Sequence, residues 1–351
     1  MKKCTLTDVL IHRILNLQNP AEAMCSAWED ERDDLMKQRG QAARAGAPVR
    51  RRAAEFKKNL PFLSMMFIPV AMLLVFNYWP MVGLSMAFQN YRAGAPFLGP
   101  KTVWVGFKWF KMLFGNPLFG RLIRNTLLLN LYDLFIGFPA TILLALLLNE
   151  VRSVALRRFT TNVSMLPHFI STVVVVGILR NFLSVDYGII NQLIANLGGK
   201  KIDFMGSDKW FRTLYTLSGV WQSAGFSAMV YTAAIAGIDP TLYEAAAIDG
   251  STRFKNVYLI TIPSIMPTII IMLILRIGSL LGSGYEKIIL MYSPTIYATA
   301  DTLGTYSYRA GIEDGKTSMS TAIGLFNAVC NVILLVIANW GSKRFSETSL
   351  F

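Results

Sequence analysis

The sequence has little charge. Only 16% of its 351 residues are Asp, Glu, Lys or Arg, whereas an average soluble chain has about 25%. Residues 1–60 hold 20 of the 55 charged residues, which leaves 35 for the other 291 positions. So few charges do not cover a water-facing surface, and hydrophobic residues make up 53% of the chain. The composition therefore excludes intrinsic disorder and an ordinary soluble fold, and it favours a chain whose bulk lies in a lipid bilayer.

Cysteine and histidine are also scarce. The three cysteines, Cys4, Cys25 and Cys330, are too scattered for a disulfide framework or a metal site. The two histidines, His12 and His168, have no nucleophile or metal motif beside them. We therefore expect no catalytic residue and no metal in this chain, which argues against a membrane enzyme.

Residues 310–317 match a permissive phosphate-binding pattern, AGIEDGKT. A genuine phosphate-binding loop follows a buried strand and precedes a helix, so that backbone N–H groups surround the phosphate. This segment follows a polar stretch instead, and Glu313 and Asp314 would repel phosphate. We expect no nucleotide site here, so ATP hydrolysis would require another polypeptide.

The net charge of +13 does not indicate a nucleic-acid partner. The sequence has no RNA-binding aromatic motif, no zinc-finger spacing and no basic helix with heptads. Instead, 19 of the 34 Lys and Arg residues fall in segments that we place on the cytoplasmic side. There they orient membrane spans and contact anionic lipids. We therefore expect no nucleic-acid binding.

Long apolar stretches recur from Pro61 onward. A helix needs about 20 apolar residues to cross a bilayer. Six stretches of that length predict spans at about 62–86, 123–148, 162–183, 213–237, 259–281 and 320–340. The predicted fold class is all-α: an integral membrane bundle of about six transmembrane helices over residues 60–345. Residues 1–59 are a separate polar block, interpreted as a cytoplasmic N-terminal tail without an assigned role.

Basic residues beside the spans predict the orientation of the chain. Lys and Arg cluster at 50–58 before the first span, at 152–158 between the second and third, and at 343–344 after the last. With six spans, these clusters share one side, and because positive loops stay inside, that side is the cytoplasm. Both termini are therefore predicted to be cytoplasmic.

The connection between the fourth and fifth expected spans has more structure than a turn. Asp239 is a good helix N-cap and Pro240 suits the first helical position. Alanines at 245–247 favour a helix, and Gly250 permits the left-handed conformation that ends it. A second helix then leads into the fifth span. Residues 239–263 are therefore predicted to form a rigid cytoplasmic coupling loop, whose small side chains let a partner approach closely.

This loop resembles the signature of permease subunits of binding-protein-dependent ABC importers. The signature reads Glu-Ala-Ala, three residues, Gly, nine residues, and Ile-x-Leu-Pro. It is matched at that spacing by Glu244, Ala245, Ala246, Gly250, Ile260 and Pro263. One position differs, because Ile262 stands where leucine is usual. The resemblance assigns these residues to coupling with an ATPase, and Asp249 adds a second charge beside Glu244.

Softer matches point to carbohydrate permeases. Residues 106–107, 116–119 and 124–126 are similar to the external segment and second span of that group. Residues 284–287, 291–294 and 324–327 are similar to a subgroup that serves complex oligosaccharides.

The resemblance implies the type I ABC importer permease fold, in a bacterial cell membrane, and several partners. A second related permease would complete the pathway, and an extracytoplasmic solute-binding protein would deliver an oligosaccharide. Two cytoplasmic ABC ATPase subunits would bind ATP and Mg²⁺, so that this chain needs no cofactor of its own. An ATP-independent secondary transporter or channel stays open as the alternative.

Polar and ionisable residues within the spans are candidates for the substrate pathway. They are Trp221, Gln222, Arg180, Arg276 and Asn327. An aromatic ring beside an amide suits a sugar, whose CH groups stack on rings while its hydroxyls need hydrogen-bond partners. The alternative is ordinary packing for the uncharged residues, and snorkelling of the charge to the interface for the two arginines.

The arginines also bear on the charge of the substrate. Arg124, Arg180 and Arg276 are expected near the external ends of spans, where low-dielectric walls would focus their positive potential. We therefore favour an acidic oligosaccharide, such as a uronate-containing fragment, over a neutral one. Asp133 lies about 13 Å deeper than Arg124 at 1.5 Å per residue, and we expect it to pair with a neighbouring helix.

Overall fold

The structure is a computed structural model that describes residues 59, 63–92, 94–100, 102–282 and 284–345. The predicted tail, 1–59, lies outside the described residues except for its last position. The chain divides into two compact units, Met1–Pro80 and Met81–Phe351. In the first unit, residues 63–80 are helical and nearly all their side chains are exposed, although most are apolar.

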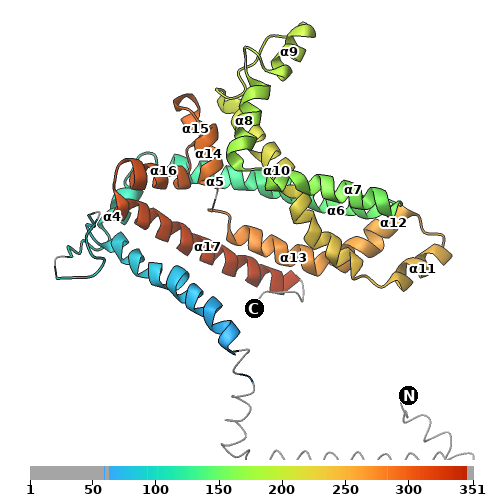
Figure 1. The fold of residues 1–351 in the computed structure, drawn as a ribbon, viewed down its shortest axis with the longest axis horizontal. Coiled ribbons are helices and arrows are strands. Elements are labelled where there is room, and N and C mark those ends of the chain that lie inside the picture. Colours follow the sequence, from blue (N-terminus) through green and yellow to red (C-terminus); the bar gives the residue numbers. More distant parts are fainter. Residues whose placement is uncertain (1–58, 60–62, 93, 101, 283, 346–351) are drawn as a thin grey trace, which may run out of the picture. The chain divides into compact units, whose positions relative to one another are not determined.

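The regular secondary structure in the described part of the second unit is helical, with no strand beyond a single bridge between Gln89 and Trp104. Its α-helices (Figure 1) are α4 (Lys108–Phe114), α5 (Phe119–Tyr132), α6 (Phe138–Glu150), α7 (Val154–Met165), α8 (Thr172–Leu183), α9 (Ile189–Asn196), α10 (Asp208–Ala236), α11 (Pro240–Ile248), α12 (Arg253–Asn256), α13 (Ile262–Gly278), α14 (Tyr285–Met291), α15 (Tyr297–Ala300), α16 (Leu303–Tyr308) and α17 (Thr317–Phe345). The π-helical turns Asp133–Gly137 and Val257–Thr261 join α5 to α6 and α12 to α13. The predicted all-α class is confirmed.

Four helices are long and apolar enough to cross a membrane: Leu63–Phe88, Phe119–Glu150, Arg253–Gly278 and Thr317–Arg344. A fifth candidate is a bent pair, Val154–Phe169 with Thr172–Leu183, whose halves meet at 96°. The stretch 162–183, expected as one span, is therefore two helix segments. Pro167 lies in the short 3₁₀ turn before the bend, and Ser171 caps the new helix by accepting a hydrogen bond from the N–H of Val174. The total of six spans stays a prediction.

The fourth expected span is the central helix of the second unit. The helix α10 packs against α5, α6, α7, α13 and α15. Its sequence is rich in Ser, Thr, Gly and Ala, so it is less apolar than the four candidate spans. That composition suits a helix surrounded by other helices. Small side chains let the neighbouring helices approach closely, and hydroxyl groups donate hydrogen bonds to carbonyls of the same helix. Ser218 and Thr232 both donate to carbonyls one turn earlier.

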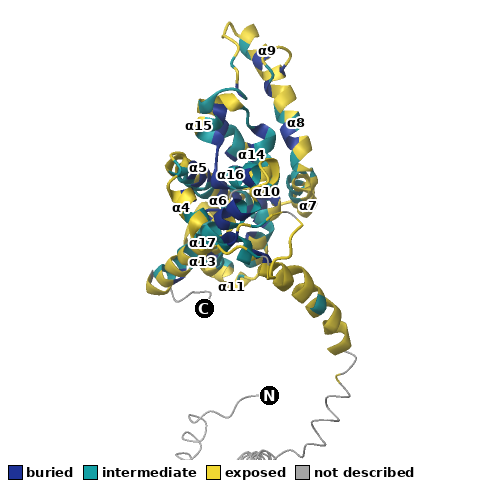
Figure 2. Cartoon of the chain, turned by 90° about the vertical axis from the view of Figure 1, so that its left-hand side faces the viewer, coloured by how far each residue is buried: buried dark blue, intermediate teal, exposed yellow. Residues whose placement is uncertain are grey.

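Buried side chains of the second unit gather between α10 and its neighbours (Figure 2). Ala145 of α6 packs against Ala228 and Tyr231 of α10. A second cluster joins α5, α8, α10 and α14 through Leu129, Val176, Phe211, Ile288 and their neighbours. These contacts fix α10 along its length and thereby position the residues described below.

Helices α14 to α16 are anchored on α5 by buried polar groups. The Asn125 side chain donates to the carbonyl oxygens of Ala298 and Asp301 at 3.0 and 2.9 Å. The Thr126 hydroxyl accepts a hydrogen bond from the N–H of Leu303 at 3.0 Å. Since both α5 residues are buried, these bonds hold the connection between the fifth and sixth expected spans in one place.

Gly225 marks the closest approach of α10 to α7. A β-carbon built at Gly225 would overlap the backbone carbonyl of Ser164, which cannot rotate away. We expect Gly225→Ala to destabilise the fold by about 1–3 kcal/mol or more, because the two helices must separate. Gly324→Ala on α17 is the matched control, since a β-carbon there meets nothing within 4 Å. Thermal unfolding of the two purified variants in detergent tests this, and equal midpoints would contradict the close approach.

Candidate functional site

The coupling loop begins with a capped helix. Asp239 is the N-cap of α11, and its carboxylate accepts a hydrogen bond from the N–H of Thr241 at 2.9 Å. That hydrogen bond lowers the pKa of Asp239. Pro240 takes the first helical position, as expected. The predicted start of the loop helix is confirmed at both residues.

The loop then turns a sharp corner at Gly250. Gly250 has φ +69°, and its N–H donates to the carbonyl of Ala247 at 3.1 Å. The N–H of Ser251 donates to the carbonyl of Ala246 at 2.9 Å. This pair of bonds is the Schellman motif, which satisfies the last carbonyls of a helix and requires a left-handed residue. The predicted left-handed glycine is confirmed.

The second half of the loop runs without interruption into the membrane helix. Thr252 caps α12, and the helix continues through Val257–Thr261 into α13. The Tyr243 hydroxyl of α11 lies 2.9 Å from the Thr261 hydroxyl, so it ties α11 to the base of α13. A displacement of α11 is therefore transmitted to α13 by a hydrogen bond as well as by the backbone.

The outer face of the loop is exposed and largely apolar. Ile248 is 87% exposed, Phe254 is 85% exposed, and Tyr258, four residues after Phe254, is also exposed. Of the predicted coupling residues, Glu244, Ala245, Asp249, Gly250 and Pro263 are exposed, while Ala246 and Ile260 are half-buried. An apolar patch of this kind, with charges at its edge, is typical of a protein-binding surface.

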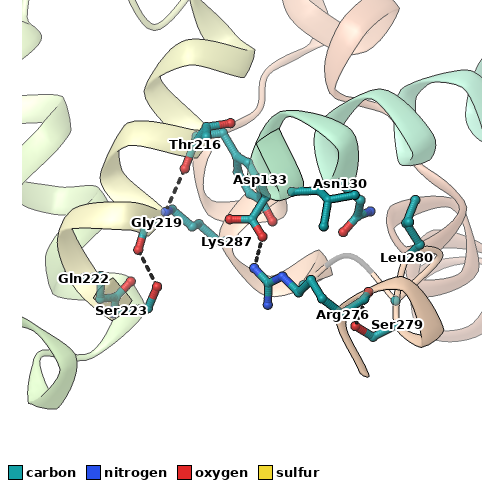
Figure 3. A pocket seen from close by; sticks show the side chains of 14 residues that line it. Asn130, Asp133, Thr216, Gly219, Gln222, Ser223, Arg276, Ser279, Leu280 and Lys287 are labelled. Atoms are coloured by element: carbon teal, nitrogen blue, oxygen red, sulfur yellow. Dashed lines mark hydrogen bonds and ion pairs between the residues drawn. The ribbon is translucent and has the colours of Figure 1, made fainter. Parts of the chain in front are cut away.

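A cavity of about 260 Å³ lies between α5, α10, α13 and α14 (Figure 3). Most of its lining side chains are polar or charged. The lining residues are Asn130, Asp133, Leu134, Tyr215, Thr216, Gly219, Gln222, Ser223, Arg276, Ser279, Leu280, Gly282, Gly284 and Lys287. Asp133 and Gln222 lie about midway along the Phe119–Glu150 and Asp208–Ala236 helices, so the cavity opens at the middle of the bundle.

Part of the cavity wall is backbone without helical structure. The helix α13 ends at Gly278, and the described residues 279–282 and 284 lie between it and α14. The side-chain oxygen of Asn331, on α17, accepts a hydrogen bond from the N–H of Leu281 at 3.0 Å. Ser279, Leu280, Gly282 and Gly284 all line the cavity, so the segment that follows the end of α13 forms part of its wall.

Three charged groups line the cavity. Asp133, in the π-helical turn after α5, forms an ion pair with Arg276 at the end of α13. The Lys287 ammonium group donates to the Tyr215 carbonyl at 3.1 Å and lies 5.1 Å from the centre of the Tyr215 ring. Burial lowers the pKa of Lys287 to about 8, so that it is still mostly protonated at pH 7.

The structure brings together two of the five pathway candidates. Gln222 and Arg276 both line the cavity, and Gln222 also donates to the Ile170 carbonyl at 2.9 Å. Trp221 faces a separate apolar groove between α8 and α10. Arg180 donates to the Leu290 carbonyl at 2.6 Å, and the buried side-chain oxygen of Asn327 has no hydrogen-bond partner within the described ranges.

The structure bears on what the sequence predicts for Asp133 and Arg276. The predicted pairing of Asp133 with a neighbouring helix is confirmed by Arg276. Arg276 lies in the last turn of α13, near the end of its span as expected, and its partner Asp133 lies about midway along the Phe119–Glu150 helix. Lys287 was not among the candidates. Its sequence signal is weak, because Lys287 follows Glu286 directly before the apolar residues 288–291.

The phosphate-binding pattern at 310–317 has the wrong structure for a nucleotide site. The helix α16 precedes the match, and the π-helical turn Arg309–Glu313 forms its first half. These residues therefore lack the strand that precedes a phosphate-binding loop.

Comparisons with known proteins place the chain in a family. Residues 137–347 match the model of the binding-protein-dependent transport system inner membrane component. The chain belongs to this family. The permease YteP of the polygalacturonan/rhamnogalacturonan transport system of Bacillus subtilis (strain 168) is 44% identical over 292 residues, which cover 83% of this chain and 90% of the relative.

Solved structures of the same family agree. A chain of a bacterial alginate ABC transporter, in complex with an alginate pentasaccharide-bound periplasmic protein, has a TM-score of 0.77 and 40% identity, covering 85% of this chain and 99% of its own length. A second structure, of an ABC transporter involved in the import of the acidic polysaccharide alginate, has a TM-score of 0.76 and 41% identity, with 84% and 99% coverage. The predicted resemblance to carbohydrate permeases of ABC importers, with the type I fold, is confirmed, and the family is a transport component, not an enzyme.

Proposed function

We propose that the chain is the membrane-spanning permease subunit of an ATP-driven importer that takes up oligosaccharides from an extracytoplasmic solute-binding protein. The observation that carries this proposal is the coupling loop: a capped helix, a Schellman corner and a rigid connection to α13, which together bear the family signature. A loop with this stiffness transmits a push from a partner to a membrane helix. The ATP-independent transporter considered above is disfavoured by the family assignment.

The proposal includes two ATPase subunits and a second permease. The exposed apolar side chains of the loop, Ile248 and Phe254 among them, would bind one ATPase subunit in the cytoplasm. ATP-driven closure of the ATPase pair would push α11, and through Tyr243 and Thr261 the base of α13. That movement would open the pathway outward, and ATP hydrolysis would restore the inward-facing state. ATP and Mg²⁺ bind to the ATPase subunits in this scheme.

The orientation in this proposal rests on the two ends of α10. The loop α11 follows the carboxyl end of α10, whereas α15 packs near its amino end, where the Thr299 hydroxyl donates to Asp208 at 2.8 Å. The coupling loop and the α14–α16 segment therefore lie at opposite ends of this helix (Figure 1). We propose that the loop and both termini are cytoplasmic, and that α14–α16 face the binding protein.

We also propose that the substrate is an acidic oligosaccharide. The relatives named above serve polygalacturonan, rhamnogalacturonan and the acidic polysaccharide alginate. The cavity supports this choice, because it has two cations, Arg276 and Lys287, against one carboxylate, Asp133. Its amides and hydroxyls suit the hydroxyl groups of a sugar.

Glu244→Lys tests the docking surface. The variant reverses a charge at the exposed edge of the loop, and we expect it to lose most of the ATPase subunits that copurify with the wild-type chain. The measurement is the amount of ATPase in affinity-purified complexes, by quantitative mass spectrometry. Glu313→Lys, which reverses an exposed charge after α16, is the control and is expected to keep its ATPase. Equal amounts of ATPase in both variants would sink the docking assignment.

A further inference from the structure

The cavity described above has an excess of positive charge. Asp133 is its only carboxylate, and Arg276 occupies it (Figure 3). Lys287 has no carboxylate within 4.0 Å in the part of the chain that the structure describes, and its ammonium group contacts only the carbonyl and ring of Tyr215. A carbonyl and a ring stabilise a cation without neutralising it, so the cavity retains a net charge of about +1.

The position of this charge matters. It lies midway along α10, beside a π-helical turn at Asp133 and a break in α13 at Gly278. Departures from α-helical structure of this kind recur at functional sites, because they redirect side chains and backbone groups toward a ligand. Nothing else in the described structure neutralises Lys287, and anions are attracted to a partly desolvated cation in a low-dielectric wall.

The remaining lining suits a sugar. Asn130, Thr216, Gln222 and Ser223 supply amide and hydroxyl groups around the three charged side chains. Gly219 lies beside Lys287, since a β-carbon there would be in ordinary van der Waals contact with the ammonium nitrogen, at 3.5 Å. The lining therefore combines two groups that bind a carboxylate with several that hydrogen-bond hydroxyls.

We propose that this cavity is a transient binding site for a uronate residue of the passing oligosaccharide. The carboxylate of the substrate exchanges with Asp133 as the partner of Arg276, and Lys287 contacts the same sugar. This inference rests on the proposed function and assigns its acidic substrate to particular side chains.

The exchange with Asp133 would let the substrate leave the site. A site with two free cations would hold an anionic sugar tightly and slow its release. A pathway site must attract its substrate and also let it leave. Asp133 competes for Arg276, so it keeps the affinity for the substrate carboxylate low. Lys287 has no carboxylate within 4.0 Å among the described residues, so its positive charge attracts an anion whether or not Asp133 is paired.

The experiment uses the complete transporter in proteoliposomes, loaded with its binding protein and ATP. Uptake of a uronate trisaccharide is compared with uptake of the same trisaccharide after its carboxyl groups are reduced to alcohols. The acidic-to-neutral uptake ratio is measured for wild type, Lys287→Gln, Lys287→Arg and the control Lys209→Gln. Lys209 is an exposed lysine on the same helix α10 that lines the cavity, but it lies outside the lining.

We expect Lys287→Gln to lower the acidic-to-neutral ratio about tenfold, equivalent to about 1.4 kcal/mol. Lys287→Arg should keep the wild-type ratio because it keeps the charge, and Lys209→Gln should leave it unchanged. Asp133→Asn frees Arg276, so we expect uptake of the acidic sugar to saturate at a lower concentration and at a lower maximal rate.

Several outcomes overturn the inference. An unchanged ratio in Lys287→Gln, or an equal loss of acidic and neutral uptake, would mean that Lys287 acts only in packing. If Lys287→Gln does not assemble, Asp133→Asn decides, and an unchanged saturation curve for the acidic sugar overturns the exchange. The proposed function fails separately, because a wild-type transporter that takes up neither sugar, or only the neutral one, refutes the acidic oligosaccharide before any variant is compared.

Discussion

Gly250→Val is expected to reduce ATP-driven sugar uptake by about tenfold or more. Gly250 has φ +69°, a conformation that a β-branched residue adopts at a cost of about 1–2 kcal/mol or more. A β-carbon at this position meets nothing within 4 Å, so the cost is one of backbone conformation and not of a clash. We expect the Schellman corner to rearrange, which changes the angle between α11 and α12 and misaligns the surface that the ATPase would push.

Gly250→Asn is the matched control for this prediction. Asparagine tolerates the left-handed conformation, so the corner and most of the uptake should survive. Sugar uptake and ATPase activity are measured with the same reconstituted complex. Normal uptake with valine, or an equal loss with asparagine, would show that the left-handed corner is not needed for coupling.

The coupling loop shows why part of this structure could be predicted from sequence. Helix caps and glycine corners depend on residues within a few positions of each other, so Asp239, Pro240 and Gly250 could be assigned without knowledge of the rest of the chain. The family signature, which includes Gly250, then predicted a role for the loop. The predicted loop therefore agrees with the structure nearly residue by residue.

The cavity shows why the other part of the candidate site could not be predicted from the sequence. Asp133, Arg276 and Lys287 come from three different elements and meet only because α13 ends at Gly278. The Gly- and Ser-rich run SLLGSG after Gly278 is a local signal for that end, but it does not say which side chains meet beside it. Trp221 and Gln222 show the same limit, because adjacent residues on one helix face different neighbours, and the pattern alone does not say which face meets the cavity.

The bend between α7 and α8 is a third case. Composition predicts one apolar span at 162–183. The hydropathy of a segment does not reveal whether its helix bends. The local signals were present, because Pro167 removes a backbone donor and Ser171 is a good N-cap. What stabilises the bend is tertiary: the His168 ring stacks on Phe226 of α10, with ring centres 4.1 Å apart.

The buried ion pair between Asp301 and Arg309 supports the second large prediction. Its shortest nitrogen–oxygen distance is 2.7 Å, and the Asp301 and Arg309 side chains are 2% and 20% exposed. The Thr305 hydroxyl also donates to Asp301 at 2.8 Å, and Arg309 lies over the Tyr297 ring. This network joins α15, α16 and the turn after α16, the segment that we propose faces the binding protein.

Arg309→Met is expected to destabilise the protein by about 3–5 kcal/mol, because it leaves the Asp301 carboxylate buried without its partner. The double variant Asp301→Asn/Arg309→Met removes both charges and should regain most of that loss. Lys316→Met is the control, since the Lys316–Asp314 pair is more than half exposed and such pairs contribute about 0–1 kcal/mol. Thermal unfolding in detergent compares the three. A double variant as unstable as Arg309→Met would show that the loss comes from packing of the arginine, whereas recovery identifies the unpaired carboxylate as its cause.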